Sequence, residues 1–257
     1  MATEHTTDTT ALITGATAGI GHEFAVQLAS RGHDLVLVAR DTARLDEVAA
    51  ALRAAHGVEV EVITADLVER DQLALVEARL TDPARPIDLL VNNAGFGLKK
   101  RFLDNPIEAE NAMLDVLVTA VLRLTHAALG PMTERGRGGI INVSSVAAFL
   151  PRGTYAATKA WVNSFTEWAA NEYRAQGVTV MALCPGFTKT EFHERMEVAK
   201  GTSFMWLDVE FLVEKALSDF DKGRIYSIPG AQYKTVVALT RLVPNKALQA
   251  LQGIGRK

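Results

Sequence analysis

A tyrosine and a lysine four residues apart, Tyr155 and Lys159, are the residues of this chain best suited to move a proton. At this spacing both side chains lie on one face of a helix, so the ammonium can sit beside the phenol. A phenol has a pKa of about 10, and a nearby cation lowers that value toward neutral pH. Ser145, one loop earlier, could hydrogen-bond the reacting oxygen of a substrate. Together, these three residues predict an active site that interconverts a carbonyl and an alcohol and that needs a hydride carrier.

The pair alone is weak evidence, because such a pair is more often a half-buried phenol beside a solvated ammonium. A glycine-rich turn near the N-terminus indicates the hydride carrier. Gly15, Gly19 and Gly21 have the spacing G-x-x-x-G-x-G and follow a short apolar run. Glycines let a backbone approach a pyrophosphate closely, and a helix that begins there offers free N–H groups. The alternative interpretation is an ordinary glycine-rich turn.

The composition is that of a globular protein with a large core: 257 residues, 48% hydrophobic and 22% charged. A formal net charge of −3 gives no electrostatic case for nucleic-acid binding. The polar start lacks an apolar signal core, and no apolar run approaches the ~20 residues that cross a bilayer. The single cysteine, Cys184, excludes an internal disulfide and fits a cytoplasmic location. The histidines lack metal-ligand spacing, so no metal site is expected.

Short apolar runs alternate with helical patterns along the whole chain. Strands are expected at 11–14, 35–39, 58–64, 87–91, 139–143, 178–183 and 224–227. Helices are expected near 20–30, 42–55, 69–80, 107–129, 154–176 and 209–221. This alternation predicts a doubly wound, Rossmann-like parallel sheet of about seven strands in a three-layer α/β/α arrangement. No linker interrupts the sequence, so residues 1–257 are expected to form one domain.

Polar residues follow several of the expected strands, at the edge of the sheet where nucleotides bind. With them, the chain resembles the short-chain dehydrogenase/reductase family, in its single-domain type of roughly 250 residues, from about Thr10 to Pro229. The resemblance rests on Thr14–Gly21, Asp66, Asn92–Gly95, Ser145, Tyr155, Lys159 and Pro185-Gly186, in order and at family spacing.

The resemblance implies a role for each of these residues. Tyr155 would be the general acid–base, Lys159 would lower its pKa and bind the nicotinamide ribose, and Ser145 would polarise the substrate oxygen. The implied cofactor-binding residues are Gly15, Thr17, Gly19, Ile20, Gly21, Arg40, Asp66, Leu67, Asn93, Ala94, Gly95, Tyr155, Lys159, Pro185, Gly186 and Thr188.

The end of the second strand indicates which nicotinamide cofactor is used. An NAD site usually has a carboxylate there, which binds the ribose 2′-hydroxyl. Here that position is Ala39, followed by Arg40, whose guanidinium suits a 2′-phosphate. NADP(H) is therefore expected rather than NAD(H). The alternative is that Arg40 pairs with Asp41, or that Asp41 caps the next helix.

Two features depart from the family pattern. The interval from Ser145 to Tyr155 is about three residues shorter than in the family, which would reshape one wall of the substrate pocket. Leu117 stands where many relatives have an asparagine whose backbone carbonyl helps to hold a water beside the lysine. We interpret Leu117 as a tolerated variant with a slower or rerouted proton relay. The alternative is a nucleotide-binding regulatory or interaction protein on the same scaffold, with weak or lost turnover.

Residues 187–207 occupy the place of the family's substrate lid and are rich in Phe, Met and Trp. The expected substrate is therefore a small hydrophobic carbonyl compound or its alcohol. Its wall is expected to include Phe96, Phe149, Phe192 and Met196, although the same side chains could instead pack into the core.

The tail, residues 233–257, is expected to pack over the cleft or on a sister subunit. Contact of its apolar and basic residues with a membrane surface is the less favoured alternative. By resemblance, helices 107–129 and 154–176 form the subunit interface of a homodimer or homotetramer. The sequence thus predicts an NADP(H)-dependent oxidoreductase and leaves the physiological substrate and direction open.

Overall fold

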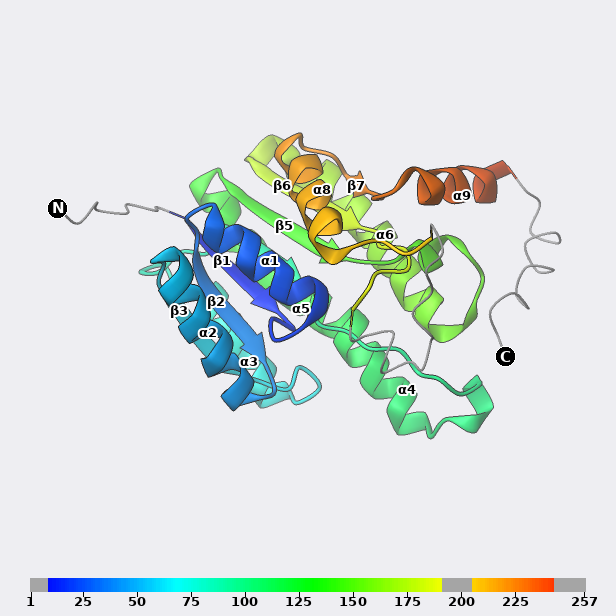
Figure 1. Cartoon of the computed structure of the whole chain (residues 1–257), viewed down its shortest axis with the longest axis horizontal. Coiled ribbons are helices and arrows are strands. Elements are labelled where there is room, and N and C mark those ends of the chain that lie inside the picture. The colour runs from blue at the N-terminus through cyan, green and yellow to red at the C-terminus, as the bar shows by residue number, and fades with distance from the viewer. Residues whose placement is uncertain (1–8, 191–204, 243–257) are drawn as a thin grey trace.

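A seven-stranded parallel sheet forms the centre of the computed structural model, which describes residues 9–190 and 205–242 (Figure 1). The strand order is β3-β2-β1-β4-β5-β6-β7, and every neighbouring pair is parallel. The strands are β1 Thr10–Thr14, β2 Asp34–Ala39, β3 Val60–Thr64, β4 Leu89–Asn92, β5 Gly138–Val143, β6 Val178–Leu183 and β7 Tyr226–Ser227. The predicted fold class is confirmed.

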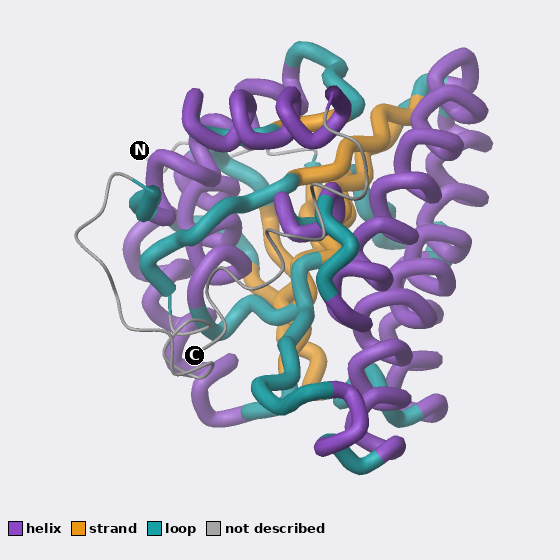
Figure 2. Tube along the Cα trace, turned by 90° about the vertical axis from the view of Figure 1, so that its right-hand side faces the viewer, coloured by secondary structure: helices purple, strands orange, loops and turns teal. Residues whose placement is uncertain are grey.

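Helices cover both faces of the sheet, as Figure 2 shows edge-on. They are α1 Gly19–Ser30, α2 Thr42–His56, α3 Arg70–Leu80, α4 Ile107–Leu114, α5 Ala120–Arg135, α6 Gly153–Tyr173, α8 Val209–Asp221 and α9 Ala231–Leu242. Successive strand residues point to opposite faces, so Leu35 and Leu37 join the core under α1, α2 and α8. Val36 and Val38 join the second core, under α3, α5 and α6. Strands with two covered faces explain the near-continuous apolar runs of the sequence.

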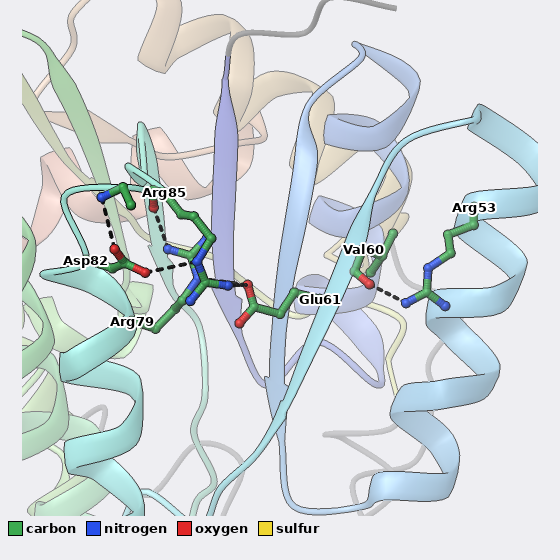
Figure 3. A network of polar contacts seen from close by, with 7 residues as sticks. Arg53, Val60, Glu61, Arg79, Asp82 and Arg85 are labelled. Carbon is green, nitrogen blue, oxygen red and sulfur yellow. Dashed lines mark hydrogen bonds and ion pairs between the residues drawn. The ribbon is translucent and has the colours of Figure 1, made fainter.

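The bounds of three strands differ from the predicted ones by two residues: the central strand β4, which begins at Leu89 rather than at residue 87, and the two edge strands. β3 begins at Val60 rather than at residue 58, and β7 has only Tyr226 and Ser227 of the four residues expected. Edge strand β3 is held by side chains (Figure 3): buried Arg79 donates to Glu61 over 2.8 Å. Arg53 donates to the carbonyl of Val60 from the other side. These contacts fix an edge that has a neighbouring strand on one side only.

The helix predicted at 107–129 extends to Arg135 and contains a π-helical turn, Asp115–Thr119, between α4 and α5. We expected no apolar run long enough to cross a bilayer, and this is wrong, because one helix has the necessary length and composition. Ile107–Glu134 has an 18-residue window of mean hydropathy 1.6, but half of that window is buried inside the protein. A core helix passes the same test, so this finding carries no argument for a membrane span.

The sheet changes winding direction between β1 and β4, which are neighbours in space but far apart in sequence. In doubly wound sheets, ligands bind in the crevice beyond the carboxyl ends of the strands at this point. The loops that follow β1 and β4 are Gly15–Ala18 and Asn93–Gly95. The fold therefore places the glycine-rich turn and the Asn-Asn-Ala-Gly segment side by side.

Candidate active site

Side-chain hydrogen bonds join the two loops at the crevice. The Thr14 hydroxyl accepts the N–H groups of Asn93 and Ala94, each over 3.0 Å. The Asn93 side-chain amide donates back to the carbonyls of Thr14, over 2.9 Å, and Gly15, over 3.2 Å. Asn93, one of the implied cofactor-binding residues, thus braces the glycine turn.

The turn leaves no room for side chains where the chain bends into α1. Gly15 has φ +68°, a left-handed conformation that favours glycine. A Cβ on Gly21 would lie 2.3 Å from both the Gly15 carbonyl oxygen and the Asn93 amide nitrogen. Ala18, the N-cap of α1, makes no side-chain hydrogen bond to the N–H groups of the first turn, and this turn has no acidic residue. This helix N-terminus therefore fits the pyrophosphate of a dinucleotide.

At the far end of the crevice, Arg40 approaches Asp66 over 3.6 Å, with 71% of its side chain exposed. Asp41 caps α2 by accepting the Arg44 N–H over 3.1 Å. The alternative that Asp41 caps the next helix is thus confirmed, and its carboxylate is engaged there. Leu67 is buried in the core beneath Asp66. An accessible guanidinium is left at the position expected to meet a ribose 2′-substituent.

Tyr155 and Ser145 meet as the sequence predicts, and their hydroxyls share a hydrogen bond. Ser145 stands at the end of β5, as the N-cap of the 3₁₀ turn Val146–Phe149, and its hydroxyl accepts the Ala147 N–H over 3.1 Å. Ser144 points elsewhere: its hydroxyl donates to the backbone carbonyl of Lys159 over 3.0 Å. Of the two adjacent serines, Ser145 is therefore the one that faces the phenol.

Lys159 is buried one helical turn beyond Tyr155, with 4% of its surface exposed. Its ammonium donates to the Val143 carbonyl over 2.6 Å and lies 5.9 Å from the centroid of the Tyr155 ring. Burial lowers the pKa of Lys159 to about 8, and the neighbouring Cys184 acts weakly in the other direction. The site therefore contains a cation that titrates near physiological pH.

The expectation that Lys159 lowers the pKa of Tyr155 is wrong for this structure. Burial raises the pKa of the phenol to about 12, and the opposing influence is the hydrogen bond with Ser145. The ammonium is directed at a backbone carbonyl rather than at the phenol oxygen. Tyr155 is thus a protonated phenol at neutral pH, the form that donates a proton during carbonyl reduction.

Leu117 lies in the π-helical turn and is fully buried. A Cβ on Gly95 would lie 2.8 Å from the Leu117 Cδ2 and 3.9 Å from the Lys159 ammonium nitrogen. The departure from the family pattern therefore lies close to Lys159. π-turns interrupt the regular hydrogen-bond ladder and occur often at functional sites. No residue type in the sequence signalled this turn.

The residues expected to line a substrate pocket separate into three groups. Phe96 is partly buried and packs against the core under α3, α5 and α6. Phe149 packs against Tyr226, with ring centroids 6.4 Å apart, and lines a pocket of about 280 Å³. The other residues around this pocket are Ala148, Leu150, Pro151, Arg152, Gly153, Ala156, Ala157 and Ala160. Phe192 and Met196 lie outside the described residues.

The segment Pro185–Thr188 lies between the end of β5 and the glycine turn. The Pro185 carbonyl accepts the Val146 N–H over 3.0 Å, and the Thr188 hydroxyl donates to the Gly186 carbonyl over 3.1 Å. Two residues that the sequence did not single out also contribute. Thr190 would lie 3.2 Å from a Cβ on Gly19, and Tyr233 packs on Gly186.

Glu110 is a third site residue that the sequence did not single out. This buried carboxylate of α4 accepts a hydrogen bond of 2.7 Å from Thr154, the residue before Tyr155. It also accepts a hydrogen bond of 2.8 Å from the Asn105 side-chain amide. Contacts of this kind join residues far apart in sequence and carry no local motif.

Comparison with known proteins agrees with this geometry. Residues 9–200 match the family model described as short chain dehydrogenase. The chain is 34% identical over 188 residues to the very-long-chain 3-oxoacyl-CoA reductase of Anas platyrhynchos, which covers 70% of this chain. It spans only 60% of that relative's length.

Two solved structures match over nearly the whole chain. A short-chain dehydrogenase from Sphingobium yanoikuyae in complex with NADPH is 38% identical, with a TM-score of 0.84 and 97% of both chains covered. A bulky-bulky ketone specific alcohol dehydrogenase from Comamonas testosteroni is 34% identical, with a TM-score of 0.80 and 94% of both chains covered. This chain belongs to the short-chain dehydrogenase/reductase family, whose oxidoreductases act on CH–OH and carbonyl groups with NAD(P).

Proposed function

We propose that this protein is an NADP(H)-dependent oxidoreductase that interconverts a hydrophobic carbonyl compound and its alcohol, with Tyr155 as the acid–base. The observation that carries the proposal is the hydrogen bond between the Tyr155 and Ser145 hydroxyls beside a buried ammonium. These two hydroxyls can both reach one substrate oxygen. Ser145 would polarise the carbonyl, and the protonated phenol would supply the proton as negative charge develops on that oxygen.

The residues that would hold the cofactor follow the crevice. The N-terminus of α1 and the glycine turn would bind the pyrophosphate, Arg40 the 2′-phosphate, and Lys159 the nicotinamide ribose. Gly186 and Thr188 would border the nicotinamide, which supplies the hydride when bound. The NADPH complex of the Sphingobium yanoikuyae protein supports the choice of cofactor.

The proposed substrate class is supported by the pocket and by the relatives. Four of the nine residues around the pocket are alanine, and Phe149, Leu150 and Pro151 add larger apolar surfaces beside Arg152, which suits a mostly apolar group. The Comamonas testosteroni alcohol dehydrogenase is specific for bulky-bulky ketones. The test is NADPH oxidation by the purified chain against a panel of aliphatic, aromatic and steroid ketones. Tight NADPH binding without oxidation by any ketone would instead favour a nucleotide-binding regulatory protein.

Arg40 provides a direct test of cofactor preference. Arg40→Ala should lower kcat/KM for NADPH by roughly 10- to 100-fold, the range for a lost hydrogen bond between charged groups. Activity with NADH should change less than about threefold, because NADH has no 2′-phosphate. Arg31→Ala is the matched control, since Arg31 follows the opposite end of α1 and pairs with Asp221. Equal losses with both cofactors would contradict the assignment.

The pH dependence of reduction should follow Lys159. The rate should be nearly constant between about pH 6 and 7 and should fall as pH rises through about 8, where the ammonium loses its proton. Tyr155, with a pKa of about 12, stays protonated throughout this range. In Lys159→Arg the cation persists at every accessible pH, so the decline near pH 8 should disappear. The same decline in that variant would assign the titration to another group.

A further inference from the structure

Tyr233, in the first turn of α9, contacts the backbone at Phe187, beside the proposed nicotinamide site, and at Met205. The residue is 2% exposed. Its hydroxyl accepts the Phe187 N–H over 2.8 Å and donates to the Met205 carbonyl. Phe187 directly follows Gly186, whereas Met205 lies much later in the chain, shortly before α8. One phenol therefore ties together two backbone positions that are distant in sequence.

The ring of Tyr233 also explains why residue 186 is a glycine. A Cβ on Gly186 would lie 2.0 to 2.4 Å from three ring carbons. Gly186 is not among the glycines with positive φ, so its backbone conformation does not require glycine. What excludes a side chain is the aromatic ring that lies against it. The phenol thus contacts residue 186 through its ring and residue 187 through its hydroxyl.

The backbone around these contacts forms a small paired structure. Leu207 donates its N–H to the Phe187 carbonyl over 2.9 Å, and Lys189 donates to the Leu207 carbonyl over 3.0 Å. Thr188 and Leu207 form a parallel bridge, and Thr188 is buried. Tyr233 contacts one chain of this pair at Gly186 and Phe187 and the other chain at Met205, so it restrains both chains just before the bridge.

We infer that Tyr233 is a positioning residue for the nicotinamide-binding segment 185–188, and that α9 is therefore part of the cofactor site. The ligand named here rests on the proposed function. The restraint on residues 186–189 rests only on the contacts described. Burial raises the pKa of Tyr233, so its hydroxyl keeps its proton and both hydrogen bonds across the working pH range.

The test compares Tyr233→Phe with Tyr226→Phe in the full chain. Tyr233→Phe keeps the ring on Gly186 and removes both hydrogen bonds. Tyr226 is the matched control, because its hydroxyl also makes two hydrogen bonds, but to residues of α6. It donates to the Asn163 carbonyl over 3.2 Å and to the Glu167 carboxylate over 3.0 Å. NADPH binding, measured by its fluorescence, should weaken roughly five- to tenfold in Tyr233→Phe, because the two lost hydrogen bonds no longer hold residue 187 and Met205 in place. It should change less than about twofold in Tyr226→Phe.

Amide hydrogen exchange separates this inference from the proposed function. Peptides covering residues 186–190 should exchange faster in Tyr233→Phe, with or without NADPH, and should be unchanged in Tyr226→Phe. Unaltered exchange in Tyr233→Phe, or equal weakening of NADPH binding in both variants, would overturn the inference. Should the wild type fail to bind NADPH at all, the proposed cofactor would be wrong, and the exchange data alone would decide the role of Tyr233.

Discussion

Tyr155→Phe is expected to lower kcat for carbonyl reduction by about 10²- to 10⁴-fold, the usual contribution of a positioned general acid. The substitution removes the hydroxyl bonded to Ser145 and keeps the ring beside the Lys159 ammonium. NADPH affinity should stay within about threefold of wild type, because the Tyr155 ring stays in place and the glycine turn, Arg40 and Lys159 are unaffected. Steady-state rates and NADPH titration measure the two quantities separately.

Tyr173→Phe is the control, since it makes the same chemical change at the other end of α6. Tyr173 packs edge-on against Trp168 and lies far along the helix from the site. Its kcat should equal that of wild type. A Tyr155→Phe protein that retained a tenth or more of the wild-type rate would remove the phenol from the mechanism, and Ser145 would then be the first candidate for the proton donor.

Lys159→Met should abolish turnover and, at the same time, stabilise the fold. The pKa of Lys159 is about 8 in the folded protein, against an ordinary value of 10.5, so keeping the buried cation charged at neutral pH costs roughly 3 kcal/mol. Methionine has a similar length and no charge. It loses the hydrogen bond to Val143, worth about 1 kcal/mol. The free energy of unfolding at pH 7 should therefore rise by about 1–3 kcal/mol, measured by urea denaturation.

The sign of this effect can be checked against pH. The folded wild type binds fewer protons than the unfolded chain between about pH 8 and 10.5, so its stability rises with pH across this window. The advantage of Lys159→Met should be complete below about pH 8 and disappear near 10.5. Lys222→Met, at an exposed lysine that bonds Ser218, is the control and should change stability little. A Lys159→Met protein that is less stable than wild type would show that the buried ammonium makes a net stabilising contribution to the fold.

The sequence predicted the parts of this protein that local patterns determine. Runs such as Leu35–Ala39 identified the strands, because both faces of the sheet are covered. The glycine spacing and the Tyr155–Lys159 interval located the crevice and the catalytic helix. β7 was predicted too long, because Ile225 continues the apolar pattern although only Tyr226 and Ser227 pair with β6.

What could not be predicted depends on burial and on contacts between distant residues. The pKa of Tyr155 rises because the fold desolvates it, whereas helical spacing alone suggested that Lys159 would lower it. Asp41 was a possible partner for Arg40 by proximity in sequence, but it caps α2, and Asp66 from the next strand approaches the guanidinium instead. The contact of Tyr233 with Gly186 joins residues 47 positions apart and has no sequence signature.

The bracing of Gly15 by Asn93 has a consequence for biosynthesis. The two hydrogen bonds from the Asn93 amide span 78 and 79 positions of the chain. While the ribosome has delivered only β1, α1 and β2, the glycine turn can bond the Val38 carbonyl of β2 but lacks the hydrogen bonds from Asn93. The full set of contacts around the turn forms only when β4 emerges and pairs with β1. A dinucleotide bound at this turn would therefore stabilise chiefly the later, nearly complete sheet.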